Sequence, residues 1–331
     1  MPDKLQLGDT IGICSPASGV AALCPRRFQR GIDHIKELGF QVKVATNALK
    51  RTDYMAGSIQ DRVDDLHELF TDKGVKAIIT AIGGYSSHQL LEQLDFNLIQ
   101  QNPKILLGYS DITSLHLAIL KKANLVTYLG PSVLVQFGEF DGLLPFTKKY
   151  FFDLLVEGDE VNYESSDACI YETLMWDEDD DRKRKTVSHT GMKVVKSGQA
   201  KGSIVAANLS TLLLLAGTRY FPDMDGVLLC LEDDEEESPA FLDRFFTQLR
   251  QMGVYHQIAG LIIGRFHKQV GFKDGQLESL LLRVTDGHVF PIIVGADFGH
   301  TDPMYILPNG IKAELNAEQS ISFRLLEKAV K

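Results

Sequence analysis

Two kinds of apolar pattern alternate between residue 10 and about residue 130. Short apolar runs such as TIGIC, VKAIIT and KILLG are typical of buried strands. Between them, segments such as RRFQRGIDHIKEL and SIQDRVDDLHELF carry apolar residues at helical spacing. This order of strand, helix and strand predicts parallel strands joined by crossover helices.

The α/β pattern returns in the second half of the chain. The runs VLLCL, GLIIG and PIIVGA predict buried strands, and PAFLDRFFTQLRQ predicts a helix capped by Ser238. The tail MYILPNGIKAELNAEQSISFRL predicts hairpin strands around Pro308, Asn309 and Gly310. At 331 residues the chain exceeds the roughly 250–300 residues at which a single core stops growing, so two domains are expected.

The stretch between the two halves breaks this pattern. Its segment YETLMWDEDDDRKRKTVSHTG places five acids before four bases, and charge alone favours a solvated surface loop. The single tryptophan, Trp176, lies in this loop, where it either anchors the loop or covers a ligand. We expect an N-terminal domain over 1–140, a linker with the charged loop over 141–200, and a C-terminal domain over 201–331.

Composition and charge limit the partners. The chain is 44% hydrophobic and 24% charged, as in soluble globular proteins, and its net charge of −10 disfavours nucleic acid and membrane surfaces. No apolar run is long enough for a membrane span and the first residues lack the features of a signal peptide, so we expect a cytoplasmic protein. Metal-ligand spacings and phosphate-loop motifs are also missing, and we expect no metal and no cofactor.

Polar residues that follow predicted strands are the candidates for chemistry, because the crevice of a parallel sheet opens there. Ser110 stands at the turn between KILLG and a helix, where a serine is either a nucleophile or a helix N-cap. As a nucleophile it would use the backbone N–H of Asp111 to stabilise an oxyanion. Gly83 and Gly84 end a neighbouring strand, and they either approach a ligand or form a tight turn.

An acid and a base also follow strands. Glu232 comes directly after VLLCL, whereas Glu235 and Glu237 are expected to be solvated loop charges. His267 and His300 each follow a buried run, and periodicity does not separate them as candidate bases.

Several segments together resemble the LD-carboxypeptidase family, which includes murein tetrapeptide carboxypeptidases and the microcin C immunity peptidases. The segments, in family order, are GDTIGICSPAS, AIGGYSSHQLLEQLDF, PKILLGYSDITSLHLAI, GSIVAANLSTLLLLAGT, GVLLCLEDDEE, IAGLIIGRF and PIIVGADFGHTDPMYILPNG. The resemblance implies an α/β fold with a parallel sheet flanked by helices in the N-terminal domain. A smaller C-terminal α/β domain with additional strands follows, and the site lies between the two.

The resemblance also implies a serine peptidase that hydrolyses an amide bond through an acyl-enzyme. It assigns Ser110 as the nucleophile, His300 as the general base and Glu232 as the carboxylate that orients it. The backbone N–H groups of Gly84 and Asp111 would form the oxyanion hole. The implied substrate is a small peptide, either a cell-wall LD-peptide or a microcin-type peptidyl-nucleotide, and the implied assembly is a homodimer.

Two family motifs are altered near the expected substrate pocket. The usual G-G-Y-G-S is GGYSS here and contains Tyr85, and the usual G-G-N-L is AANL, which contains Asn208. Tyr85, Asn208 and Trp176 are the expected substrate-binding residues. For Trp176 the expectation comes from the resemblance to the microcin branch, in which an aromatic residue on a comparable charged loop can stack on a nucleobase. The competing hypothesis from another class is a non-catalytic protein that binds a small peptide in the same interdomain cleft.

Overall fold

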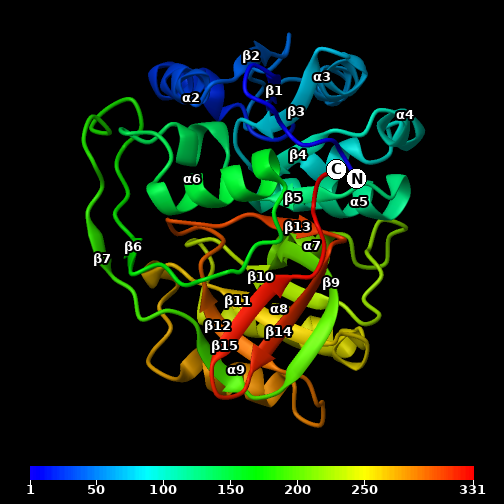
Figure 1. Cartoon of the computed structure of the whole chain (residues 1–331), viewed down its shortest axis with the longest axis vertical. Helices are drawn as coiled ribbons and strands as arrows, with labels where there is room; N and C mark the ends of the chain where they lie inside the picture. Colours follow the sequence, from blue (N-terminus) through cyan, green and yellow to red (C-terminus); the bar gives the residue numbers. More distant parts are fainter.

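Two β-sheets organise the computed structural model, which describes residues 1–331 (Figure 1). The first sheet contains, in spatial order, β13 (Leu307–Asn309), β5 (Thr127–Leu129), β4 (Ile105–Gly108), β3 (Val75–Thr80), β1 (Thr10–Cys14) and β2 (Gln41–Val44). All neighbours in this sheet pair in parallel except β13, which is antiparallel to β5. Its helices are α1 (Val20–Leu23), α2 (Pro25–Glu37), α3 (Ile59–Thr71), α4 (Phe96–Gln101), α5 (Thr113–Ala123) and α6 (Pro145–Phe152).

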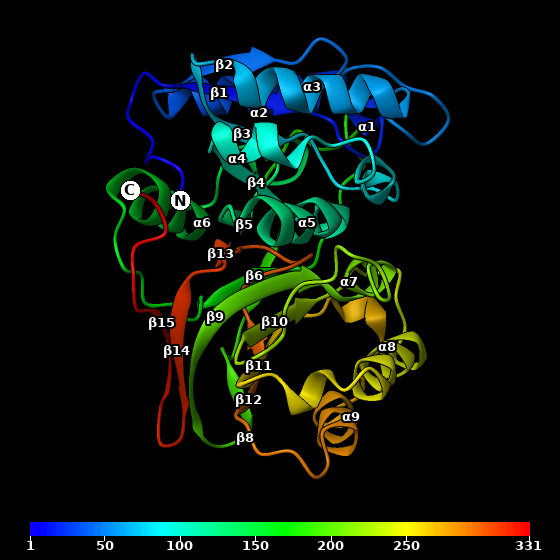
Figure 2. The same cartoon turned by 90° about the vertical axis from the view of Figure 1, so that its right-hand side faces the viewer.

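The second sheet has a parallel centre and antiparallel edges. Its spatial order is β15 (Ile321–Leu325), β14 (Lys312–Ala317), β9 (Gln199–Asn208), β10 (Leu228–Glu232), β11 (Gly260–Gly264), β12 (Ile292–Ala296) and β8 (Lys193–Lys196). The strands β9 to β12 run parallel. Helices α7 (Leu209–Leu214), α8 (Pro239–Gln251) and α9 (Gln276–Val284) lie on one side of this sheet (Figure 2). The mixed α/β class expected from the sequence is confirmed.

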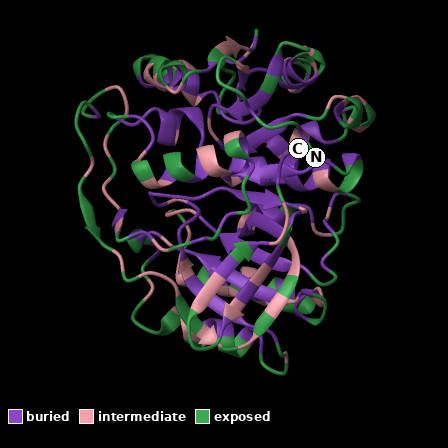
Figure 3. Ribbon diagram, viewed as in Figure 1, coloured by how far each residue is buried: buried purple, intermediate pink, exposed green.

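The two halves share their apolar interior. Two clusters of 47 buried residues each run through the molecule, and both contain strand residues from the first and the second sheet. Figure 3 shows the buried residues as a continuous band through the two sheets and the layer between them. Burial of this extent is the main contribution that holds the two sheets in a fixed relation.

Local sequence signals explain where the main helices begin. Ser58 and Asp61 form a capping box at the start of α3, in which each side chain accepts a hydrogen bond from the other residue's backbone N–H. Ser238 caps α8 by accepting from the N–H of Phe241, and Pro239 occupies the first turn. The serine cap that the sequence predicts for this helix is confirmed. No helix combines the length and the apolarity that a membrane crossing requires.

The predicted hairpin at the C-terminal end is displaced in the structure. Pro308 and Asn309 lie in β13, which joins the first sheet, and they do not form a turn between two strands of one hairpin. The hairpin is formed instead by β14 and β15, with the turn at residues 318–320. The prediction was wrong because the signal Pro308-Asn309-Gly310 marks the point where the chain passes from one sheet to the other.

Strands β6 (Ala168–Ile170) and β7 (Thr186–Ser188) form a separate two-stranded sheet. They flank the charged loop, which projects at the side of the molecule in Figure 1. This short ribbon brings the loop back toward the region between the two main sheets.

Candidate active site

Ser110 occupies a strained turn directly after β4. Its φ is 63°, in the left-handed region that non-glycine residues rarely adopt. The short 3-10 turn Ser110–Ile112 that follows has no side-chain cap, so the structure does not use Ser110 as an N-cap. A strained strand-to-helix elbow of this kind exposes the serine hydroxyl at the carboxyl end of a sheet.

His300 and Glu232 form a buried acid–base pair. The Nδ1 of His300 lies 2.6 Å from Oε2 of Glu232, and the exposed fractions of the two side chains are 14% and 2%. Burial lowers the pKa of His300, but the charge of Glu232 and the hydrogen bond to it outweigh burial, with smaller contributions from Asp234 and Glu235. Together they raise the pKa of His300 to about 9. The carboxylate therefore holds the ring in one orientation, with Nε2 as the atom available for proton transfer.

The second candidate base lies elsewhere. The Nε2 of His267 lies 2.8 Å from the carbonyl oxygen of Tyr171, and its Nδ1 accepts a hydrogen bond from the N–H of Gln269. Both ring nitrogens are thus used, and no carboxylate orients the ring. The geometry separates His267 from His300, which sequence periodicity did not.

The side chain of Asp111, the residue after Ser110, holds the loop that follows β3 close to Ser110. The Asp111 carboxylate accepts hydrogen bonds from the N–H groups of Ser86 at 2.9 Å and Ser87 at 2.8 Å. The N–H of Gly84 donates no hydrogen bond within the chain. A Cβ on Gly83 would lie 2.9 Å from the Cβ of Ser110 and 3.3 Å from the N of Asp111, so glycine permits this close approach.

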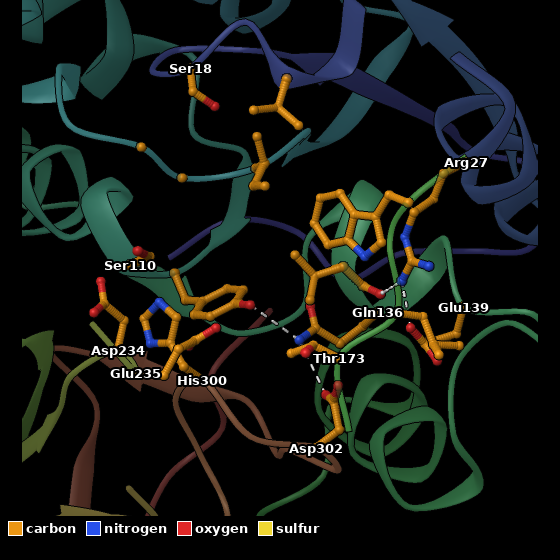
Figure 4. A pocket seen from close by; sticks show the side chains of 18 of the residues that line it. Ser18, Arg27, Ser110, Gln136, Glu139, Thr173, Asp234, Glu235, His300 and Asp302 are labelled. Atoms are coloured by element: carbon orange, nitrogen blue, oxygen red, sulfur yellow. Dashed lines mark hydrogen bonds and ion pairs between the residues drawn. The ribbon is translucent and has the colours of Figure 1, made fainter. Parts of the chain in front are cut away.

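These elements surround one cavity of about 340 Å³ between the two sheets (Figure 4). Its wall contains Ser18, Arg27, Gly83, Gly84, Tyr85, Tyr109, Ser110, Gln136, Glu139, Trp176, Arg184, Asp234, Glu235, His300 and Asp302, among others. The hydroxyl of Ser110 makes no hydrogen bond with the imidazole of His300. A missing or long hydrogen bond of this kind is common in enzymes without substrate, so it does not exclude the pair as nucleophile and base.

The charged loop lies at the surface with most of its charged side chains exposed, as its composition predicts, but three of its charged residues are docked on the body of the molecule. The Asp177 carboxylate accepts from the N–H groups of Arg26 and Arg27, at 2.8 and 2.7 Å, at the start of α2. Asp180 pairs with the buried guanidinium of Arg27 at 2.8 Å. Arg184, in the basic half of the loop, pairs with Glu139 at 2.9 Å.

Trp176 anchors the loop, one of the two roles that the sequence left open, and it also lies on the cavity wall. Its partly buried ring packs against the apolar core, and the guanidinium carbon of Arg27 lies 4.6 Å from the ring centroid. The same residue contributes to the cavity wall. The ring therefore anchors the loop and is also placed where a ligand would contact it.

The other two expected substrate-binding residues differ in position. Tyr85 lines the cavity and its hydroxyl donates to Oε2 of Glu236 at 3.0 Å. Asn208 is buried, does not line the cavity, and uses its side chain to cap α7 and to donate to Asp233 at 2.8 Å. On β9, Asn208 is the register partner of Glu232 on the neighbouring strand β10, so it lies next to the acid of the His300–Glu232 pair.

Sequence reasoning missed several residues of the cavity wall. Arg27 lies on a helix, where an arginine normally indicates a solvated face, and Glu139 follows a segment without a clear pattern. Asp302 stands two residues after His300, and this proximity was the available signal. Glu235, expected as a solvated charge, also lines the cavity. No group of three or more His, Cys, Asp or Glu side chains is arranged to hold a metal ion.

Comparisons with known proteins identify the family of this chain. The sequence model of the family LD-carboxypeptidase N-terminal domain matches residues 11–130. The sequence model of the LD-carboxypeptidase C-terminal domain matches residues 201–315. A Bacillus subtilis protein named "Probable murein peptide carboxypeptidase" is 33% identical over 322 residues, covering 96% of this chain and 92% of that protein.

Solved structures extend the similarity to the whole fold. An MccF-like protein from Bacillus anthracis has a TM-score of 0.93 and 34% identity, covering 98% of this chain and 99% of that one. The microcin C7 self-immunity protein MccF in complex with aspartyl sulfamoyl adenosine has a TM-score of 0.92 and 29% identity, covering 100% and 99%.

Proposed function

Because the chain belongs to the LD-carboxypeptidase family, we propose that it is a serine carboxypeptidase that uses Ser110, His300 and Glu232 as its catalytic triad. The observation that carries this proposal is the buried His300–Glu232 pair at 2.6 Å, in the same cavity as a serine held at a φ of 63°. Nucleophile, base and orienting carboxylate are the three groups that acyl transfer needs.

The reaction proceeds in two halves. The Oγ of Ser110 attacks the carbonyl carbon of the amide while Nε2 of His300 takes its proton, and Glu232 stabilises the imidazolium that forms. His300 then gives this proton to the leaving amine, the C–N bond breaks and an acyl-enzyme remains. A water molecule next attacks the ester carbonyl, again with His300 as base, and Ser110 regains its proton as the acid product leaves.

The oxyanion of each tetrahedral intermediate is stabilised by the backbone N–H groups of Gly84 and Asp111 in this mechanism. The free N–H of Gly84 and the short separation between Gly83 and Asp111 support this assignment. Asp111 has a second role, because its side chain fixes the loop that carries Gly84 through Ser86 and Ser87.

The substrate is a small peptide or a peptidyl-nucleotide, with Tyr85 and Trp176 as contact residues. Both side chains line the cavity, which supports direct contact. We assign Asn208 a positioning role beside Glu232, since its side chain is engaged in the protein interior. Family resemblance further supports a cytoplasmic homodimer, and light scattering of the purified protein tests the dimer.

The test is the Ser110→Ala variant assayed by mass spectrometry on an LD-tetrapeptide and on an aminoacyl sulfamoyl adenosine. We expect hydrolysis to fall by at least about a thousandfold, since loss of a triad member removes nucleophilic attack. The control is Ser320→Ala, at an exposed position in the hairpin turn. Wild-type turnover by Ser110→Ala overturns the mechanism, and tight ligand binding without any hydrolysis by the wild-type protein supports the binding-protein hypothesis instead.

A further inference from the structure

One buried arginine of the first domain forms no ion pair. Arg62, on α3, is 1% exposed, and no carboxylate oxygen lies within ion-pair distance of its guanidinium. The two other buried arginines, Arg27 and Arg265, each pair with at least one carboxylate. A buried charge is costly unless hydrogen bonds compensate for the lost water, so the contacts of Arg62 show what the charge is used for.

All three nitrogens of the Arg62 guanidinium donate hydrogen bonds. Its Nη1 lies 3.1 Å from the carbonyl oxygen of Pro16, 3.1 Å from the carbonyl oxygen of Ser86 and 2.9 Å from the Oγ of Ser86. Its Nη2 donates to Oε1 of Gln89 at 3.0 Å, and its Nε donates to the carbonyl oxygen of Ser58 at 3.3 Å. Pro16 belongs to the loop after β1, whereas Ser86 and Gln89 follow β3. The planar fork of an arginine is suited to joining several segments in this way.

The two loops joined by this guanidinium meet at Gly84. The N–H of Ser18, in the loop after β1, donates to the carbonyl oxygen of Gly83 at 3.2 Å. A Cβ on Gly84 would lie 2.8 Å from the Cβ of Ser18, so the two backbones are in close contact there. The Oγ of Ser86 also donates to the carbonyl oxygen of Ala17 at 3.3 Å. The position of the Gly84 N–H therefore depends on how these two loops pack against each other.

Ser86 is held by a buried anion as well as by the buried cation. Its N–H donates to the Asp111 carboxylate at 2.9 Å, while its carbonyl oxygen and its hydroxyl accept from Arg62. Burial lowers the pKa of Arg62, and the charge of Asp111 opposes this effect. The guanidinium and the carboxylate thus form a pair separated by one residue, and that residue lies two positions after Gly84.

We propose that Arg62 is a positioning residue that fixes the N–H of Gly84 relative to Ser110. It acts together with Asp111, because both hold Ser86. The inference rests on the proposed function, since it concerns the oxyanion site of the same reaction. Arg62 does not line the cavity and so does not touch the substrate. Its loss should leave substrate binding nearly unchanged and slow the step in which the oxyanion forms, because a displaced donor stabilises the transition state less.

The experiment compares Arg62→Lys and Arg62→Met with the wild-type protein. The lysine keeps the charge without the fork, and the methionine keeps only the apolar stem. We measure kcat and KM by mass spectrometry on whichever substrate the wild-type protein hydrolyses, the LD-tetrapeptide or the aminoacyl sulfamoyl adenosine. We expect kcat to fall by about a hundredfold in Arg62→Met and by at least about tenfold in Arg62→Lys, with KM within about threefold of wild type. The midpoint of the pH profile should not move, because Arg62 contacts neither His300 nor Glu232.

Leu66→Ala is the matched control for stability. Leu66 is buried on the same helix, one turn after Arg62, and its side chain makes no hydrogen bond to either loop. This variant should lower the unfolding temperature and leave kcat and KM of the folded protein unchanged. A fall in kcat of the same size in Leu66→Ala would show that loss of stability is the cause, and would overturn the assignment.

A double variant tests whether the two charges act on the same loop. If Arg62 and Asp111 both work through Ser86, Arg62→Met combined with Asp111→Asn should lose less activity than the product of the two single losses. Full multiplication of the losses, a wild-type kcat in Arg62→Met, or a change confined to KM overturns the inference while leaving the triad intact. If Arg62→Met does not fold, Arg62→Lys is judged by the same outcomes. Absence of hydrolysis and of phosphonate labelling at Ser110 in the wild-type protein refutes the proposed function itself, and this inference with it.

Discussion

The backbone of Gly83 touches the side chain of Ser110: a Cβ at position 83 would lie 2.9 Å from the Cβ of Ser110 and 3.0 Å from its Oγ. Real Cβ atoms do not approach other carbon atoms so closely, and Ser110 has little freedom to move because its own backbone is strained. The glycine therefore determines how near the loop after β3 comes to Ser110, the proposed nucleophile.

Replacing this glycine should disable the nucleophile without unfolding the protein. In Gly83→Ala the added methyl group displaces either Ser110 or the loop that carries Gly84. We expect the labelling of Ser110 by a serine-reactive phosphonate to slow by about a hundredfold. Gly74→Ala is the control, since its Cβ would meet only a carboxylate oxygen of Asp72 at 3.2 Å. Unchanged labelling in Gly83→Ala, measured under the same conditions, would contradict the proposed oxyanion hole.

Gly299 lies equally close to the side chain of Glu232, the acid of the proposed triad. A Cβ there would lie 2.7 Å from Oε2 of Glu232, the atom that pairs with His300, and the residue has a φ of +106°. Gly299→Ala should therefore break the pair and reduce hydrolysis by a factor on the order of a thousand. Gly287→Ala has a similar positive φ, +83°, but no neighbouring atoms within 4 Å, so it isolates the effect of backbone strain. If both variants lose activity equally, the contact with Glu232 is not the cause.

The pH dependence follows from the charge state of His300. Its pKa of about 9 means that most molecules carry an imidazolium at neutral pH, and only the neutral form accepts the proton of Ser110. The rate at which a serine-reactive phosphonate with an uncharged side chain labels Ser110 should rise by about tenfold per pH unit up to roughly pH 9 and then level off. A rate that is constant from pH 7 to pH 9 would show that His300 is already neutral, and would remove this account of the base.

A substitution of Ser18 can distinguish a contact with the ligand from a contact that stabilises the fold, because the Ser18 hydroxyl lines the cavity and has no partner in the protein. Since its buried hydroxyl has no partner, Ser18→Ala should leave the unfolding temperature unchanged or slightly higher. The KM for the substrate should nevertheless increase, by about tenfold, because a hydrogen bond to the ligand is lost. Ser132→Ala is matched to it, as another buried serine with an unpaired hydroxyl that does not line the cavity. A KM that stays at the wild-type value in Ser18→Ala argues against contact with the ligand.

Much of the fold could be predicted because its central strands are buried on both faces. Runs such as VKAIIT and LLCLE are almost entirely buried in the structure, and a continuous apolar run is a strong local signal. The turn at Ser110 was also visible, since an apolar strand, one polar turn and an amphipathic helix follow one another within 18 residues.

The remaining features depend on partners distant in the sequence. His267 and His300 both follow buried strands, so local pattern does not distinguish them; the family resemblance favours His300, and in the structure Glu232, 68 residues away, contacts His300 alone of the two. The charged loop has the composition of a solvated segment, but Asp180 and Arg184 find their counter-charges on Arg27 and Glu139. Local pattern cannot contain this information, because the pairing arises only when the two sheets come together.

Strand β13 links the segment that carries His300 to the sheet that carries Ser110. His300 lies on the segment between β12, in the second sheet, and β13, which pairs with β5 of the first sheet. This segment, which carries the imidazole of His300, is therefore fixed to the second sheet at one end and to the first sheet at the other. A rotation of one sheet against the other would move this segment and shift the His300 ring relative to Ser110. The reactivity of Ser110 would then depend on how the two halves of the molecule are aligned, because the cavity that both residues line lies between the two sheets.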